Sequence, residues 1–115
     1  MSEIKKLTEK IIEFRNERDW EQFHKPKDLA ISLSLEASEL LEHFQWKSNE
    51  EIEEYIKNNK EEIGDELGDV FNYLLIMAHD FGIDLADVAM KKIEKNKAKY
   101  PVEKAKGKHT KYNKL

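Results

Sequence analysis

The sequence predicts an all-α protein with four or five helices packed as a bundle. Glu, Lys, Leu, Ile and Ala, which favour helices, dominate a chain that has only two prolines and four glycines. Apolar residues recur at spacings of three and four, and no strand-like alternation is found. A chain of 115 residues is long enough for a single core. We therefore expect one helical domain.

The first two helices are predicted from capping residues and apolar spacing. Ser2 can cap a helix that continues to about residue 18, and the apolar residues of this helix share one face. Pro26 is expected to break any helix, and Asp28 offers a cap for a second helix over about residues 29–45. The face of the first helix consists of Ile4, Leu7, Ile11 and Phe14.

Ser48 and Glu51 have the spacing of a capping box, which predicts a short acidic third helix that weakens near residues 58 and 59. A fourth helix is expected over about residues 60–81, with Gly82 as its C-terminal cap.

Asp84 is a cap for a fifth helix, which is expected to reach Tyr100 and to end at Pro101. We divide the chain into a helical domain over residues 1–101 and a lysine-rich tail over residues 102–115.

Composition excludes several classes of protein. Without cysteine there is no disulfide or thiolate metal site, so the cytoplasm is the default compartment. No apolar run is long enough to span a membrane.

Residues 91–115 carry ten lysines against two glutamates, a net charge of +8. The whole chain has a net charge of −4, so residues 1–90 carry −12. This acidic core argues against a nucleic-acid partner, although a solvated tail and a phosphate partner both fit the lysines.

Two predicted helices carry an acidic strip between apolar surfaces. On the second helix the strip includes Glu36 and Glu39, and on the fourth it includes Glu66 and Asp69. Residues three apart lie together on a helix, so antiparallel packing would bring the four carboxylates to one place. Buried carboxylates need compensation, and an all-oxygen site suits Mg²⁺, with Mn²⁺ as a substitute. The alternative is a non-catalytic interaction module whose acidic strip pairs with lysines of another chain.

Gly64 and Gly68 lie inside the fourth predicted helix, where each costs roughly 1 kcal/mol relative to alanine. Two explanations remain open at this point: a close approach of another helix or ligand, or a break in the helix near Gly64.

Three segments resemble the MazG-like all-α nucleoside triphosphate pyrophosphohydrolases, most closely their dCTP pyrophosphatase subgroup. They are RDWEQFHKPKDLAISLSLEASELLEHFQW, DELGDVFNYL and KIEKNKAKYP, in this order. The resemblance implies a helical homodimer or dimer-of-dimers tetramer that uses Mg²⁺ to cleave a nucleoside triphosphate, dCTP-like or modified, into the monophosphate and pyrophosphate. Many relatives have a glutamate where this chain has Leu35, so roles that depend on an extra carboxylate are open.

The resemblance also implies roles for individual residues. Glu36, Glu39, Glu66 and Asp69 match metal ligands, and we expect the water-activating base to be Glu36 or Glu39. Trp20, His24 and Trp46 match the base and sugar pocket, and Tyr73 matches a substrate contact. Phosphate contacts are implied for Lys92, Asn96 and Tyr100, which are spaced four apart.

Overall fold

The computed structural model describes residues 2–115, which form helices and turns and contain no strand. The all-α prediction is confirmed. The elements are α1 (Glu3–Glu17), η1 (Glu21–Phe23), α2 (Pro26–Glu42), α3 (Asn49–Asn58), α4 (Lys60–Phe81), α5 (Leu85–Lys99), α6 (Val102–Ala105) and η2 (Tyr112–Lys114). They fall into two compact units, the first ending at Gly82 and the second beginning at Ile83.

The predicted caps form, with one exception. The Ser2 hydroxyl accepts from the Lys5 N–H, and Ser48 and Glu51 make both hydrogen bonds of the capping box. The start of α2 was predicted wrongly, because Pro26 is its first residue and Lys25 precedes it without a side-chain cap. Proline is well tolerated there, since the first turn of a helix needs no N–H partner and the ring fixes a helical φ.

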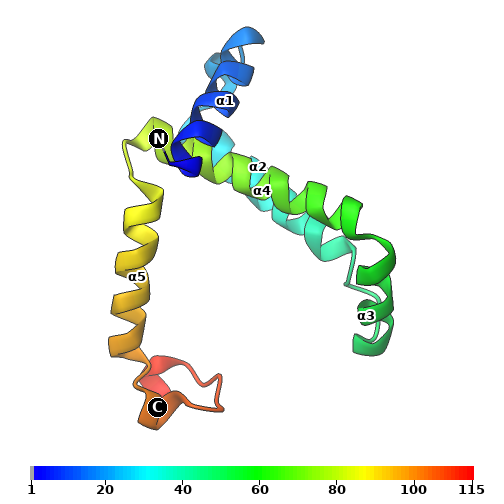
Figure 1. Ribbon diagram of the computed structural model, residues 1–115, viewed down its shortest axis with the longest axis vertical. Coiled ribbons are helices and arrows are strands. Elements are labelled where there is room, and N and C mark those ends of the chain that lie inside the picture. Colours follow the sequence, from blue (N-terminus) through cyan, green and yellow to red (C-terminus); the bar gives the residue numbers. More distant parts are fainter. Residues whose placement is uncertain (1) are drawn as a thin grey trace. The chain divides into compact units, whose positions relative to one another are not determined.

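Helices α2 and α4 form the centre of the first unit (Figure 1). The chain passes from α2 through α3 into α4, which returns antiparallel along α2, and α1 packs on α4. Leu29 of α2 and Leu75 of α4 are each 1% exposed, and Ile63 and Ile76 are also buried. This antiparallel hairpin is the arrangement that the two acidic strips require.

Helix α4 runs without interruption through Gly64 and Gly68, so the helix-break explanation is wrong. A Cβ built on either glycine would meet no atom of the described residues within 4 Å. Within residues 2–115, therefore, no neighbouring segment packs closely against either glycine. At Gly82 the reason for glycine is direct: its φ of 68° is left-handed, and its N–H caps the end of α4.

The second unit contains α5, α6 and η2. Asp84 caps α5 by accepting from the Asp87 N–H at 3.0 Å, as predicted. Beyond Pro101, α6 and η2 form, and the rings of Tyr100 and Tyr112 meet edge to face. Among the helices of residues 2–115, none combines the length and apolar character needed to cross a bilayer.

Candidate active site

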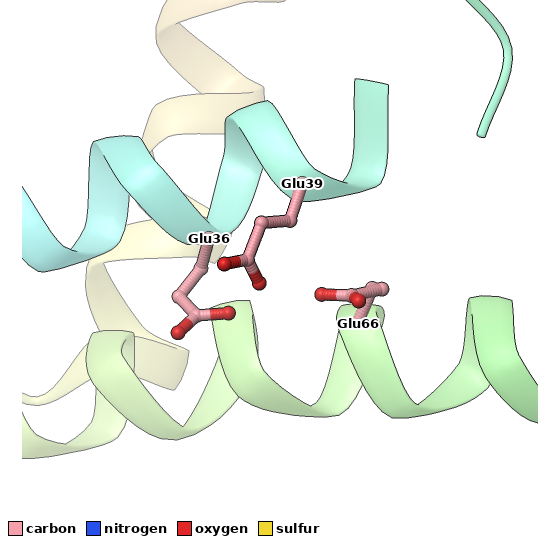
Figure 2. A group of neighbouring side chains, drawn as sticks. All are labelled: Glu36, Glu39 and Glu66. Atoms are coloured by element: carbon pink, nitrogen blue, oxygen red, sulfur yellow. The ribbon is translucent and has the colours of Figure 1, made fainter. Parts of the chain in front are cut away.

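Three glutamates from α2 and α4 point toward one another, and we call them the acidic cluster. Glu36 and Glu39 come from α2, and Glu66 faces them from α4 (Figure 2). One oxygen from each lies within 4.8 Å of the others. The two residues of α2 are three apart, so they share one face of the helix. The sequence predicts that the acidic strips of these two helices face each other, and the structure shows this for Glu36, Glu39 and Glu66.

Asp69 lies one turn along α4 from Glu66 and belongs to the same acidic surface. It is not among the described carboxylates that approach within 4.8 Å, but its charge acts on both Glu36 and Glu66. It also lines a cavity together with Glu36. Of the four predicted metal ligands, the structure brings three together and places the fourth beside them.

The electrostatics of the acidic cluster are those of an uncompensated site. Burial, hydrogen bonding with Glu39 and the charges of Asp69, Glu39 and Glu66 raise the pKa of Glu36 to about 7. Burial and the neighbouring carboxylates also raise the pKa of Glu66. The Oε2 atoms of Glu36 and Glu66 are buried and have no hydrogen-bond partner. A cation would neutralise these charges and provide the missing partner.

An aromatic cavity of about 480 Å³ begins at Glu36 and Asp69 and extends between α1 and the α2–α4 hairpin. Trp20, His24 and Tyr73, three of the predicted substrate residues, are in its wall. The full lining is Leu7, Lys10, Ile11, Phe14, Arg15, Trp20, His24, Glu36, Asp69, Asn72, Tyr73 and Ile76. An apolar, aromatic cavity of this size with a few polar groups is typical of a small-molecule site.

The turn after α1 brings Trp20 into this wall. Asp19 has a φ of 53°, and the Trp20 N–H donates to the Arg15 carbonyl at 3.1 Å. The indole then meets the Phe14 ring edge to face, with 5.6 Å between centroids. His24 follows η1, and burial together with the Arg15 charge lowers its pKa, so its imidazole is neutral at pH 7.

A second, polar cavity of about 510 Å³ lies further along the hairpin. Its lining is Glu39, Glu42, His43, Tyr55 and Glu66, and His43 Nδ1 lies 2.6 Å from the Tyr55 hydroxyl. The acidic cluster therefore contributes Glu36 to one cavity and Glu39 and Glu66 to the other.

Of the remaining predicted substrate residues, Trp46 belongs to the first unit, and Lys92, Asn96 and Tyr100 belong to the second. Trp46 is in the turn after α2, is 86% exposed and does not line the aromatic cavity. Lys92 and Asn96 lie one turn apart on α5, and Tyr100 caps that helix with its N–H bonded to the Asn96 carbonyl. Contacts of these four residues with a substrate stay predictions.

Sequence reasoning missed Arg15, Lys10 and Asn72, all of which line the aromatic cavity. The signal for Arg15 was present: it stands four residues after Ile11, on the apolar face of α1. It pairs with Asp80, near the C-terminal end of α4. Compensation for that carboxylate thus comes from Arg15 on α1 and from His79 beside it on α4.

The model of the MazG-like family matches residues 31–115, which include the acidic cluster, α4 and α5. The chain belongs to the MazG-like family. Curated relatives of this MazG-like chain include dCTP pyrophosphatase 1 of mouse, rat and human, at 39%, 41% and 37% identity over 105 residues. These alignments cover 90% of the chain and 62% of each relative, so the chain spans less than two thirds of their length.

A pyrophosphatase of known crystal structure from Archaeoglobus fulgidus DSM 4304 is similar in fold to this MazG-like chain. The TM-score is 0.83 at 39% identity, and the match covers 88% of this chain and 94% of that one. The resemblance seen in the sequence motifs is therefore confirmed at the level of family and fold.

Proposed function

We propose that this MazG-like protein hydrolyses a nucleoside triphosphate to the monophosphate and pyrophosphate with a divalent cation. One observation carries the proposal: carboxylates from two helices converge, with unpartnered buried oxygens, beside an aromatic cavity that Glu36 also lines. The names of the relatives support the same class of reaction, and dCTP or a modified nucleotide of similar shape is the substrate we propose.

The acidic cluster fits a hard cation. Its donors are all carboxylate oxygens, which Mg²⁺ and Mn²⁺ prefer, and a bound cation would offset the neighbouring carboxylate charges that help to raise the pKa of Glu36. Glu36, Glu39 and Glu66 would hold the ion, with Asp69 completing the set. When bound, such an ion supplies charge neutralisation to the phosphates and lowers the pKa of coordinated water.

The protein's own groups account for the remaining steps. Trp20 and Tyr73 provide flat surfaces for the base and sugar, and His24 provides a neutral polar edge. Glu36 or Glu39 takes a proton from the attacking water as its oxygen bonds to the α-phosphorus. The bond from that phosphorus to the bridging oxygen breaks, and pyrophosphate leaves. We assign Lys92, Asn96 and Tyr100 to the phosphates by resemblance.

The test is a product assay on canonical and modified nucleoside triphosphates with Mg²⁺, which separates pyrophosphate from orthophosphate. We expect equimolar monophosphate and pyrophosphate from at least one substrate. Orthophosphate as the only phosphate product would contradict the proposal. A non-catalytic interaction module would yield no product, and Mg²⁺ or Mn²⁺ would then leave its melting temperature unchanged.

Replacement of Trp20 or His24 by alanine should weaken nucleotide binding while metal binding persists. The physical reason is that both side chains line the aromatic cavity and neither belongs to the acidic cluster. We expect KM to rise about tenfold or more, as loss of one stacking or hydrogen-bonding contact predicts. Calorimetry with Mn²⁺ alone is the matched measurement, and an equal loss of metal affinity would show that these residues are structural.

We also propose that the protein is at least a dimer. In the first unit, Leu35, Leu41 and Leu67 are 59%, 54% and 53% exposed, on the helices that also carry the acidic cluster. Exposed apolar surface of this kind is typical of an interface, and the open space at Gly64 and Gly68 would allow a partner helix to approach. Light scattering at micromolar concentration should give at least twice the monomer mass.

A matched variant sharpens this prediction. Gly68→Ala should favour the helix by roughly 1 kcal/mol in an isolated chain. If the helix of a second copy packs on this face, the added methyl group should collide with it and weaken dimer association. A monomeric wild-type protein, or a Gly68→Ala variant with unchanged association, would contradict the proposed packing.

A further inference from the structure

Arg15 is a charged residue in a core position. Its side chain is 2% exposed, and it lines the aromatic cavity from the apolar face of α1. The guanidinium donates from Nη1 to Asp80 Oδ2 at 2.8 Å and from Nη2 to Oδ1 at 3.1 Å. Two apolar residues of similar size often support a fold as well as a buried ion pair does. Stability alone therefore does not explain the pair.

The same residue anchors the turn that carries the aromatic wall. The Arg15 carbonyl accepts from the N–H groups of Arg18 at 3.2 Å and Trp20 at 3.1 Å. Asp80 lies two turns along α4 from Tyr73, which lines the cavity from that helix. The ion pair thus links the turn that holds Trp20 to the helix that holds Tyr73.

The wall also contains two polar atoms with no partner. Arg15 Nε and His24 Nδ1 are both buried and make no hydrogen bond. The two residues are close enough for the Arg15 charge to affect His24. Unpartnered groups are costly in a core, and they are found where a ligand or ordered water supplies the partner.

We propose that the Arg15–Asp80 pair is a positioning element for base recognition, which fixes Trp20 and His24 in the wall of the aromatic cavity. The inference rests on the proposed function and assigns the substrate's base to this cavity. Neither residue belongs to the acidic cluster, so we expect metal binding there to persist when the pair is removed.

The deciding variant is the double substitution Arg15→Met/Asp80→Leu, which removes both charges and keeps much of the volume. Its control is Glu53→Leu/Lys57→Met, which removes one charge of each sign from α3, outside both cavities. Three properties are compared with wild type: the urea unfolding midpoint, Mn²⁺ affinity by calorimetry, and KM and kcat across the triphosphate panel. A fourth is the ¹⁹F resonance of 5-fluorotryptophan at position 20 without nucleotide, assigned with Trp20→Phe.

For the double variant we expect KM for the best substrate to rise about tenfold, and the preference between bases to shrink by a similar factor. The Trp20 resonance should shift or broaden, while the unfolding midpoint, Mn²⁺ affinity and kcat stay near wild type. The control should match wild type throughout. Unchanged KM, base preference and Trp20 resonance would overturn the inference, and so would a rise in KM matched by an equal loss of Mn²⁺ affinity.

If the double variant fails to fold, Arg15→Lys takes its place. It retains the charge but cannot make both hydrogen bonds to Asp80, so a smaller rise in KM and a shifted Trp20 resonance are expected. Wild-type values for both would overturn the inference. Failure of the proposed function has a different signature, namely no pyrophosphate from the wild-type protein with any triphosphate. The resonance measurement on the protein without nucleotide still tests the positioning role in that case.

Discussion

Glu36→Gln should remove pyrophosphate release and, at pH 8, stabilise the metal-free protein. The substitution keeps the shape of the side chain and removes a carboxylate that we place in both the cation site and the proton transfer. Loss of an outer-shell partner in metal sites costs about 10- to 100-fold, so loss of a ligand should lower kcat/KM by at least about 100-fold. The assay is pyrophosphate release at saturating Mg²⁺.

The gain in stability follows from the sign of the pKa shift. Glu36 has a pKa of about 7 in the folded protein and an ordinary value of 4.5. Between these values the folded state binds more protons than the unfolded state, so this group lowers the free energy of unfolding as pH rises. The loss of folding stability caused by ionised Glu36 reaches its full size above about pH 7. Urea unfolding from pH 4.5 to 8 should therefore show a flatter profile for Glu36→Gln than for wild type.

Glu53→Gln is the matched control, because it makes the same chemical change at an exposed position of α3. It should retain activity and the wild-type pH profile. The metal-site hypothesis would be contradicted if Glu36→Gln kept its turnover and lost stability at pH 8, since that is the behaviour of a residue in a structural ion pair.

Asp80→Asn should destabilise the protein more than any single substitution in the acidic cluster. The side chains of Asp80 and Arg15 are 22% and 2% exposed, and the variant leaves the guanidinium without its counter-ion. Breaking a buried pair in this way costs about 3 kcal/mol. The measurement is the free energy of unfolding in urea at pH 7, where wild-type Asp80 is ionised.

The pKa of Asp80 supports this prediction. Burial alone would raise it, but the hydrogen bonds from Arg15 and His79 and the Arg15 charge hold the pKa below its ordinary value. Stability from the pair is thus present above the ordinary value of 3.8 and is lost as pH falls through the lowered pKa. Asp87→Asn, which breaks the exposed pair with Lys91, should cost less than about 1 kcal/mol. Equal losses for both variants would show that the Arg15–Asp80 pair has no special role.

The helices could be predicted from sequence because their signals are local. The capping box at Ser48, the cap at Asp84 and the left-handed glycine at position 82 each act within a few residues. The error at Pro26 is also local, because the same residue can end one helix or begin another. The sequence pattern does not decide whether Pro26 ends one helix or begins the next when the preceding segment, here η1, is only three residues long.

The site could be predicted in part, for a different reason. Helical spacing places Glu36 beside Glu39 on one face, but it cannot give the distance from Asp69 to the other carboxylates, which depends on how α2 packs against α4. Arg15 was missed because its partner, Asp80, is 65 residues away in the chain. The exposure of Trp46 likewise depends on tertiary packing, which no local pattern specifies.

The acidic cluster is built entirely from one helical hairpin, and this has a consequence for folding kinetics. Contacts within a hairpin are close in sequence, and such topologies fold rapidly. Here the two helices must close against the mutual repulsion of their carboxylates. A cation held by Glu36, Glu39 and Glu66, as we propose, would therefore act on the step that joins α2 and α4. If the hairpin is already closed in the transition state, the ion accelerates folding. If closure comes later, the ion slows unfolding instead.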